Sequence, residues 1–435
     1  MIVLKNGVVL TNDKDDRVIW GGTVCITGNR ITYVGDDTHA PAPQPADTVI
    51  DCEGSRLIMP GLVDLHYHTC ISRGEGDWLP LMEWLDETWY PYINNIDPES
   101  AYHAAMASYC ESIKAGVTCV NDMYRQLPSL ARAAEDSGMR AVLSNDVMLR
   151  KFGHDNIDTA REAYEQCDGK ADGRVEVYIG YEWMPKGSPE LLREVRALAD
   201  ELDTGIHIHL NESLSEIEYS KEQFGRRPAE LAYENGVLGP DCVAAHCVWL
   251  SDTEIAMMAE TGTSIAHNPL SNAKLGSGIA RVPDYLARGV NVGIGHDAAK
   301  CADSRDLWEN IRAAAVYHRG ARVDSSIMPA STVLKMATVN GNKALHHDAG
   351  SIETGRLADV VTVDLDTFAM TPLRWGDDQQ LCSHLVYSNN GSYVLDSIID
   401  GRIVMRDRQL TMVNERDVIR NATKAYLQMR ERLGK

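Results

Sequence analysis

The sequence predicts an α/β protein: a (β/α)8 barrel of the TIM type with a small β-sandwich domain built from both ends of the chain. Three observations lead to this prediction. Strand-like apolar runs alternate with helical patterns from about residue 57 onward, turn-rich strand patterns occupy both ends, and neither end alone is large enough to bury a core. A doubly wound open sheet is the alternative that the same alternation allows.

The two ends of the chain have the pattern of antiparallel β structure, in which β-branched runs are separated by turn dipeptides such as Asn6-Gly7 and Asp400-Gly401. The expected strands are 2–4, 8–10, 23–26, 30–34, 358–363, 394–399, 402–405 and 409–412. We therefore assign residues 1–56 and 356–413 to one small β-sandwich domain. Residues 414–435 are expected to form a C-terminal helix.

The middle of the chain, residues 57–355, is assigned to the barrel. Eight strands are expected there, at 57–65, 118–120, 141–144, 175–180, 205–210, 242–245, 263–266 and 290–294. The segments between them begin with helix-capping patterns. Asp97-Pro98 and Ser188-Pro189 each place an N-cap residue before proline, and Ser251 with Glu254 fits a capping box.

The composition indicates a soluble globular protein and limits its partners. The 435 residues carry a formal net charge of −21, which disfavours a nucleic acid or an anionic membrane as partner. Ten cysteines with no C-x-x-C pair indicate reduced thiols, and neither a signal peptide nor a membrane-spanning run is visible. We expect a cytoplasmic protein that forms a homo-oligomer, a dimer or higher.

Histidine and carboxylate side chains recur at the ends of the expected strands, where barrels carry their chemistry. His66 and His68 end the first strand and, being two residues apart, point to the same side. His209 ends the fifth strand, His246 the sixth, and Asp297 follows the eighth. Imidazoles with one carboxylate suit Zn²⁺ or Fe²⁺, so the pattern predicts a metal site.

These residues lie in motifs that resemble a known family. The motifs are 61–68 (GLVDLHYH), 80–85 (PLMEWL), 209–212 (HLNE), 245–247 (AHC), 267–272 (HNPLSN), 275–278 (LGSG), 295–297 (GHD) and 355–361 (GRLADVV). Together they resemble the amidohydrolase superfamily, in the branch of aminoheterocycle deaminases and chlorohydrolases. The resemblance covers nearly the whole chain and implies the same split β domain.

The resemblance implies a role for each residue. The metal ligands would be His66, His68, His209 and Asp297, and the expected cofactor is one divalent ion, Zn²⁺ or alternatively Fe²⁺. The fourth strand has no lysine at its end to bridge a second ion.

Three residues of the same motifs would be catalytic: Glu212, His246 and Asp297. Metal-bound hydroxide would attack the ring carbon, while Glu212 protonates the ring nitrogen, His246 stabilises the new oxygen and Asp297 takes the proton of the water. His207 has no counterpart and is interpreted as filling or supporting the barrel interior.

Four residues are predicted to bind substrate: Trp84, Glu182, Trp183 and Arg73. Counted back from Ser188, Glu182 takes the place of a substrate-facing histidine of adenosine-type deaminases. Because a carboxylate only accepts hydrogen bonds, this substitution favours a substrate edge with N–H groups over an adenine-like edge. The tryptophans would stack on a flat ring, and Arg73 would hold a substrate anion.

The predicted function is metal-dependent hydrolytic deamination of an N-heterocycle: a purine, pterin, pyrimidine or aminotriazine. The alternatives are a triazine-type chlorohydrolase or alkylaminohydrolase, and a methylthioadenosine/S-adenosylhomocysteine deaminase. A non-catalytic scaffold is disfavoured because every motif residue is retained. The expected partners are the small heterocycle and water.

Overall fold

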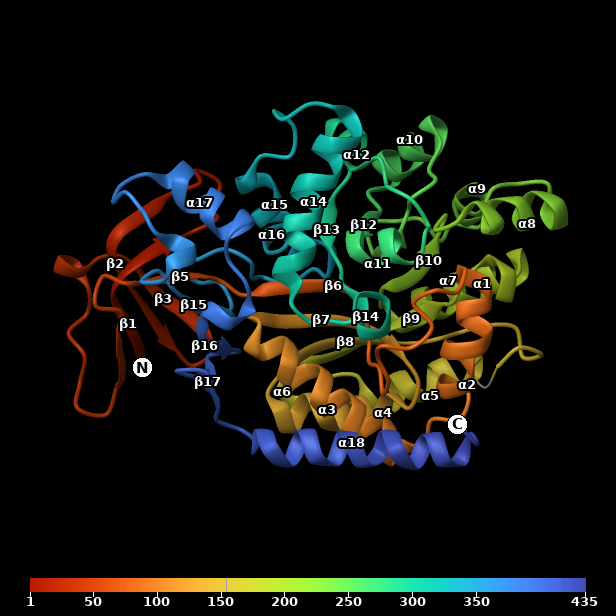
Figure 1. Cartoon of the computed structure of the whole chain (residues 1–435), viewed down its shortest axis with the longest axis horizontal. Coiled ribbons are helices and arrows are strands. Elements are labelled where there is room, and N and C mark those ends of the chain that lie inside the picture. The colour runs from red at the N-terminus through yellow and green to blue at the C-terminus, as the bar shows by residue number, and fades with distance from the viewer. Residues whose placement is uncertain (154) are drawn as a thin grey trace.

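The structure is a computed structural model that describes residues 1–153 and 155–435, and it contains two nine-stranded sheets (Figure 1). In one of these sheets all neighbouring strands are parallel, in the order β13-β12-β11-β10-β9-β8-β7-β6-β14. Its strands are β6 (Leu62–His68), β7 (Val117–Tyr124), β8 (Arg140–Asn145), β9 (Val175–Tyr181), β10 (Ile206–Leu210), β11 (Cys242–His246), β12 (Ser264–His267), β13 (Val292–Ile294) and β14 (Asp297–Ala298).

The parallel sheet closes on itself, so the predicted barrel is confirmed. Two residues separate β13 from β14, which makes them two parts of one interrupted eighth strand. β14 pairs with β6 through Asp297 and Tyr67, and the ends of the sheet meet there. The carboxyl ends of all eight strands therefore face the same mouth of the barrel.

Helices surround the barrel, as Figure 1 shows. They are α1 (Leu81–Trp84), α2 (Tyr90–Ile93), α3 (Pro98–Lys114), α4 (Leu127–Ser137), α5 (Ile157–Cys167), α6 (Lys170–Gly173), α7 (Pro189–Leu202), α8 (Leu214–Phe224), α9 (Pro228–Glu234), α10 (Asp252–Thr261), α11 (Pro269–Lys274), α12 (Val282–Ala287), α13 (Ala299–Ala302), α14 (Leu307–Arg322), α15 (Ala330–Met336) and α16 (Val339–Ala344). The predicted caps form, since the side chains of Asp97, Ser188 and Ser251 accept hydrogen bonds from the first turns of α3, α7 and α10.

The second sheet joins the two ends of the chain, with the order β18-β17-β16-β15-β5-β1-β2-β3 and β4 paired to β1. Its strands are β1 (Ile2–Leu10), β2 (Val18–Thr27), β3 (Arg30–Asp36), β4 (Thr48–Asp51), β5 (Arg56–Pro60), β15 (Val360–Asp364), β16 (Val394–Ile399), β17 (Arg402–Arg406) and β18 (Gln409–Leu410). Leu4, Val24, Ile58 and Val360 share one buried apolar core, so strands from both ends cover that core as one continuous sheet. Helix α17 (Asp378–Tyr387) belongs to the same C-terminal part of the chain.

The run expected as one strand at 57–65 is divided at Gly61. Its first half is β5, which pairs with β1 and β15 in the terminal sheet, and its second half is the first barrel strand. A Cβ atom at Gly61 would lie 2.2 Å from the side chain of Thr118, so only glycine fits at this crossing between the two sheets.

The C-terminal helix α18 (Glu415–Arg432) packs along α3 (Figure 1) and contacts the mouth of the barrel through Glu75, which pairs with the buried Lys300. The hydroxyl of Tyr426 on α18 donates to Oε1 of Glu75 (2.8 Å). The Lys300 ammonium donates to Oε2 of Glu75 (2.8 Å), to the carbonyl oxygen of Thr88 (2.8 Å) and to Oγ of Ser72 (3.1 Å). One buried cation thus links the loops after the first and eighth strands.

Two expectations from composition can be compared with this fold. All ten cysteines are free thiols, and eight of them are buried. Within the described residues, no helix combines the length and the apolar character needed to cross a membrane.

Candidate metal centre and substrate pocket

Four histidines and one aspartate meet at the mouth of the barrel. His66 and His68 lie on β6, His209 on β10, His246 at the end of β11 and Asp297 at the start of β14. Two groups of three, His66 with His68 and His209, and His66 with His246 and Asp297, each bring their ligand atoms within 4.8 Å of one another. The strand ends therefore converge as the sequence predicted.

The tautomers of His68 and His209 are fixed by backbone carbonyl groups. Nδ1 of His68 donates to the carbonyl oxygen of Met123, and Nδ1 of His209 donates to that of Glu182. A carbonyl oxygen only accepts, so both Nδ1 atoms carry the proton and both Nε2 atoms present lone pairs in the neutral imidazoles. These two Nε2 atoms are 3.0 Å apart, a repulsive arrangement that a cation between them would stabilise.

His66 is oriented in the same way through a second histidine. Its Nδ1 is 2.9 Å from Nε2 of His207, whose own Nδ1 is 3.2 Å from Oγ of Ser144. If this chain of hydrogen bonds runs toward Ser144, Nε2 of His66 keeps its lone pair, and this buried atom has no partner among the described residues. Burial, together with the neighbouring imidazoles, lowers the pKa of His66 well below its ordinary value.

Asp297 offers a charged oxygen to the same point. Its Oδ1 lies 3.5 Å from Nε2 of His68 and 3.9 Å from Nε2 of His66, while Oδ2 accepts from Oγ of Ser271 (2.6 Å). Burial alone would raise the pKa of Asp297, but the facing His68 and His246 reverse the effect and the pKa is lowered. Three imidazoles and one ionised carboxylate are the donor set of a zinc-type site, so the residues fit such an ion.

The backbone at this site is strained. Asp297 and His246 adopt φ values of 74° and 68°, in the left-handed region that residues other than glycine rarely enter. Each costs of order 1–3 kcal/mol, and such strain concentrates at functional sites because the surrounding structure holds the side chains in place.

We use the name metal-ligand cluster for the candidate ligands His66, His68, His209 and Asp297. Glu212 and His246 lie on one side of it. Oγ of Ser277 donates to Oε1 of Glu212 (2.9 Å), which orients the carboxyl group. Nδ1 of His246 lies 2.8 Å from Oδ1 of Asn272 and 3.3 Å from Nδ2 of Asn268, and Nε2 faces Oδ2 of Asp297 at 4.0 Å. Nδ1 of His246 and Oε1 of Glu212 are 3.9 Å apart, so the two side chains lie next to each other in the pocket lining.

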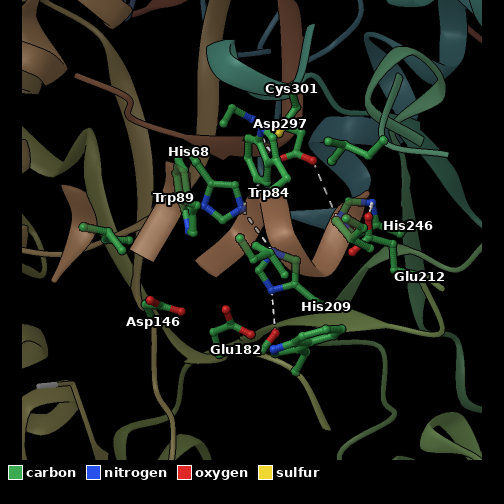
Figure 2. Close-up of a pocket in the computed structure, with 16 residues that line it drawn as sticks. His68, Trp84, Trp89, Asp146, Glu182, His209, Glu212, His246, Asp297 and Cys301 are labelled. Carbon is green, nitrogen blue, oxygen red and sulfur yellow. Dashed lines mark hydrogen bonds and ion pairs between the residues drawn. The ribbon is translucent and has the colours of Figure 1, made fainter. Parts of the chain in front are cut away.

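A pocket opens beside the metal-ligand cluster, and predicted site residues form part of its lining. Figure 2 shows the side chains that line it. The residues are His68, Leu81, Trp84, Leu85, Trp89, Ile93, Asp146, Glu182, Trp183, His209, Glu212, His246, Leu275, Asp297, Ala298 and Cys301. The rings of Trp84 and Trp89 lie nearly parallel, at 14° with centroids 6.1 Å apart, and give the wall an aromatic surface.

Trp89 reaches the pocket because the chain forms a π-helical turn, η2 (Leu85–Trp89), after α1. In an α-helix, residues five apart point about 140° away from each other. Hydrogen bonding from residue i to i+5, as from the amide of Tyr90 to the carbonyl oxygen of Leu85, widens the turn and brings Trp84 and Trp89 to one face.

The residues predicted to bind substrate divide into two groups. Trp84, Glu182 and Trp183 line the pocket. Arg73 does not: its guanidinium donates to both oxygens of Glu111 on α3, at 3.2 and 2.6 Å, and the residue lines a separate surface cavity. Trp78, which lies in the same loop as Arg73, is 79% exposed and does not line the pocket.

Glu182 is buried, and its Oε1 accepts a hydrogen bond from the hydroxyl of Tyr90 (2.8 Å). Burial, reinforced by the charge of Asp146, raises the pKa of Glu182 well above its ordinary value. Asp146 also lines the pocket and is a site residue that the sequence reasoning missed. It follows the third barrel strand directly, so the rule that strand ends carry the chemistry points to it.

Known proteins resemble this chain along most of its length. Residues 57–404 match the amidohydrolase family model. The chain is 38% identical to a 5'-deoxyadenosine deaminase of Methanosarcina mazei over 98% of this chain and 97% of the relative. It is 36% identical to a 5-methylthioadenosine/S-adenosylhomocysteine deaminase of Acetivibrio thermocellus over 96% of each chain.

Two solved structures share the fold of this chain. An adenosine deaminase of Xanthomonas campestris with bound zinc superposes with a TM-score of 0.92 at 27% identity, covering 99% of this chain and 98% of that one. An atrazine chlorohydrolase of Arthrobacter aurescens complexed with zinc shares the fold, with a TM-score of 0.88 at 23% identity and coverage of 98% and 100%.

The chain belongs to the amidohydrolase family. Its histidine and aspartate cluster can hold a metal ion, and a pocket lies beside that cluster. The protein is a metal-dependent hydrolytic deaminase of an N-heterocycle, a hydrolase that acts on a C–N bond.

Proposed function

We propose that the protein removes the 6-amino group from a purine nucleoside that is altered at its 5′ position. The names of the curated relatives support this substrate class, since both are deaminases of 5′-modified adenosines. The observation that carries the proposal is one pocket whose lining combines metal-ligand residues, Glu212 with His246, and an aromatic wall that suits a flat ring.

We infer that one divalent ion, Zn²⁺, is held by His66, His68, His209 and Asp297. Lone pairs of the first three and an ionised oxygen of the fourth converge, and no protein donor satisfies Nε2 of His66 among the described residues. When bound, such an ion acts as a Lewis acid that activates water as a nucleophile at neutral pH. The strand-four end lacks a lysine, which supports one ion rather than two.

The proposed roles of the remaining groups follow from where their protons lie. The carboxyl group of Glu212, held by Ser277, would protonate the ring nitrogen next to the reacting carbon, which makes that carbon electrophilic. Asp297 and Nε2 of His246 would accept the proton of the attacking water and stabilise the new oxygen. The same carboxyl groups would then return protons to the departing ammonia.

The experiment is an ammonia-release assay on full-length, zinc-loaded protein with 5′-deoxyadenosine. We expect release by the wild type and a loss of at least about 100-fold in Glu212→Gln, because the amide cannot donate the carboxyl proton. A chlorotriazine assayed for chloride in parallel tests the chlorohydrolase alternative. Release of chloride from the chlorotriazine, with no release of ammonia from any nucleoside, would refute the proposal.

A further inference from the structure

Two acidic side chains, Asp146 and Glu182, lie next to each other on one side of the His68–His209 pair, while Glu212 and His246 lie on the other (Figure 2). We propose that this acid pair recognises a second amino group on the purine ring, at position 2, and thereby selects 2-amino-6-aminopurine nucleosides over adenine nucleosides. The inference rests on the proposed function and specifies its substrate.

Each carboxyl group of the acid pair has one oxygen engaged by the protein. Oε1 of Glu182 accepts from the hydroxyl of Tyr90 (2.8 Å), and Oδ2 of Asp146 accepts from Nη2 of Arg125 (3.2 Å). Within the described part of the chain, Oε2 of Glu182 and Oδ1 of Asp146 form no hydrogen bond to a protein donor. Each residue therefore has one carboxyl oxygen without a protein donor, and both residues line the pocket.

Only part of the charge on the acid pair is compensated nearby. Arg125 is the one cation that contacts Asp146 among the described residues, and its Nε also faces Asp155 at 3.6 Å. Lys186, whose Nζ lies 4.8 Å from the centroid of the Tyr90 ring, acts together with Arg125 on the charge of Glu182. The pocket lining also includes apolar and aromatic side chains, among them Trp89 and Ile93. Carboxyl oxygens that a ligand covers in such surroundings are costly to desolvate unless the ligand donates to them.

An exocyclic amino group matches this arrangement. It carries two N–H donors that diverge from one nitrogen, so one can reach Glu182 and the other Asp146. In adenine the same ring position bears only C–H, which leaves both oxygens unpaired. A site that hydrogen-bonds a substrate N–H strongly rejects the analogue without it, because the buried polar groups then lose their partners. The discrimination therefore comes from the cost of leaving the carboxyl oxygens of Glu182 and Asp146 without a donor.

Equilibrium binding of the two reaction products separates this recognition from catalysis. Inosine and guanosine differ by the 2-amino group alone, so calorimetry on the full-length, zinc-loaded protein measures its contribution. We expect guanosine to bind about tenfold or more tightly than inosine, as for a hydrogen bond to a charged group. In Asp146→Asn and in Glu182→Gln we expect most of that difference to disappear.

Glu87→Gln is the matched control because it removes one negative charge from the exposed face of the same pocket-forming segment. It should keep the guanosine preference of the wild type. Thermal melting of each variant identifies any loss of folding. The preference for guanosine over inosine is already tested by the wild-type protein alone. Equal or tighter binding of inosine by the wild type overturns the inference, as does a preference that survives in either pocket variant or is lost in the control.

Ammonia release from 2-aminoadenosine and adenosine distinguishes this inference from the function on which it rests. Release from both at equal kcat/KM refutes the acid-pair inference and leaves the deaminase proposal standing. Release from neither, nor from 5′-deoxyadenosine, refutes the proposed substrate class. A kcat/KM about tenfold or more higher for 2-aminoadenosine, lost in Asp146→Asn, supports both.

Discussion

Replacing Lys300 by methionine tests how the pocket wall is held in place. The Lys300 side chain is fully buried, and its ammonium group donates to Glu75, Thr88 and Ser72. Methionine fills a similar volume but donates nothing. The segment that carries Trp84 and Trp89 would then lose its connection to the loop after the eighth strand, which carries Cys301 of the pocket.

The size of the effect follows from the geometry. Removing one partner of a buried ion pair costs about 3 to 5 kcal/mol in the free energy of unfolding. The lower end applies, about 3 kcal/mol, because the Glu75 side chain is 26% exposed and keeps the hydroxyl donors of Tyr92 and Tyr426. We expect kcat/KM to fall as well, mainly through a higher KM, since the chemical groups remain in place.

Urea denaturation and steady-state ammonia release measure the two effects. Lys343→Met, which removes an exposed lysine, is the control and should change stability by less than about 0.5 kcal/mol. The double variant Lys300→Met with Glu75→Gln should be less destabilised than Lys300→Met alone, because no carboxylate is left uncompensated. A loss of less than about 1 kcal/mol in Lys300→Met would refute the reasoning.

Three further predictions concern the reaction centre. Ser277→Ala should lower kcat by about tenfold, because Glu212 loses the hydrogen bond that orients it. A variant whose kcat for ammonia release equals that of the wild type would contradict this. Chelator treatment should abolish activity and lower Tm, and one equivalent of Zn²⁺ per chain, counted by elemental analysis, should restore both. Burial raises the pKa of Glu216 to about 8 from 4.5, so the folded protein holds this proton more tightly than the unfolded chain, and the free energy of unfolding should fall as the pH rises from about 4.5 to about 8. Glu216→Gln should remove this slope in urea melts at pH 5 and pH 8; an unchanged slope would show that Glu216 is not the group responsible.

The sequence predicts the barrel and the metal-ligand cluster because both depend on local rules. Side chains two apart on a strand share a side, and the carboxyl ends of parallel strands share one mouth, so His66, His68 and His209 can be brought together without a structure. Asp146 obeys the same rule, since it follows its strand directly, and applying the rule to every strand end would have found it. The Pro60-Gly61 dipeptide likewise indicates an interruption of the apolar run at 57–65.

Other features depend on contacts between distant segments and have no local pattern. Arg73 pairs with Glu111, 38 residues away, and nothing near Arg73 indicates that partner. The position of Trp89 requires a π-helical turn, whereas regular α-helical spacing would place it away from Trp84. A buried lysine is rare unless it is paired, so the role of Lys300 emerges only when its three acceptors are assembled from separate loops.

The sheet shared by the two ends of the chain constrains the order in which the protein can be completed during synthesis. β5 is flanked on one side by β1 and on the other by β15, whose residues are made about 300 positions later. Until then the edge of β5 has unpaired amide and carbonyl groups while the barrel is being made. An exposed edge of this kind can pair with another nascent chain, so slow translation or truncation before β15 should favour aggregation over folding.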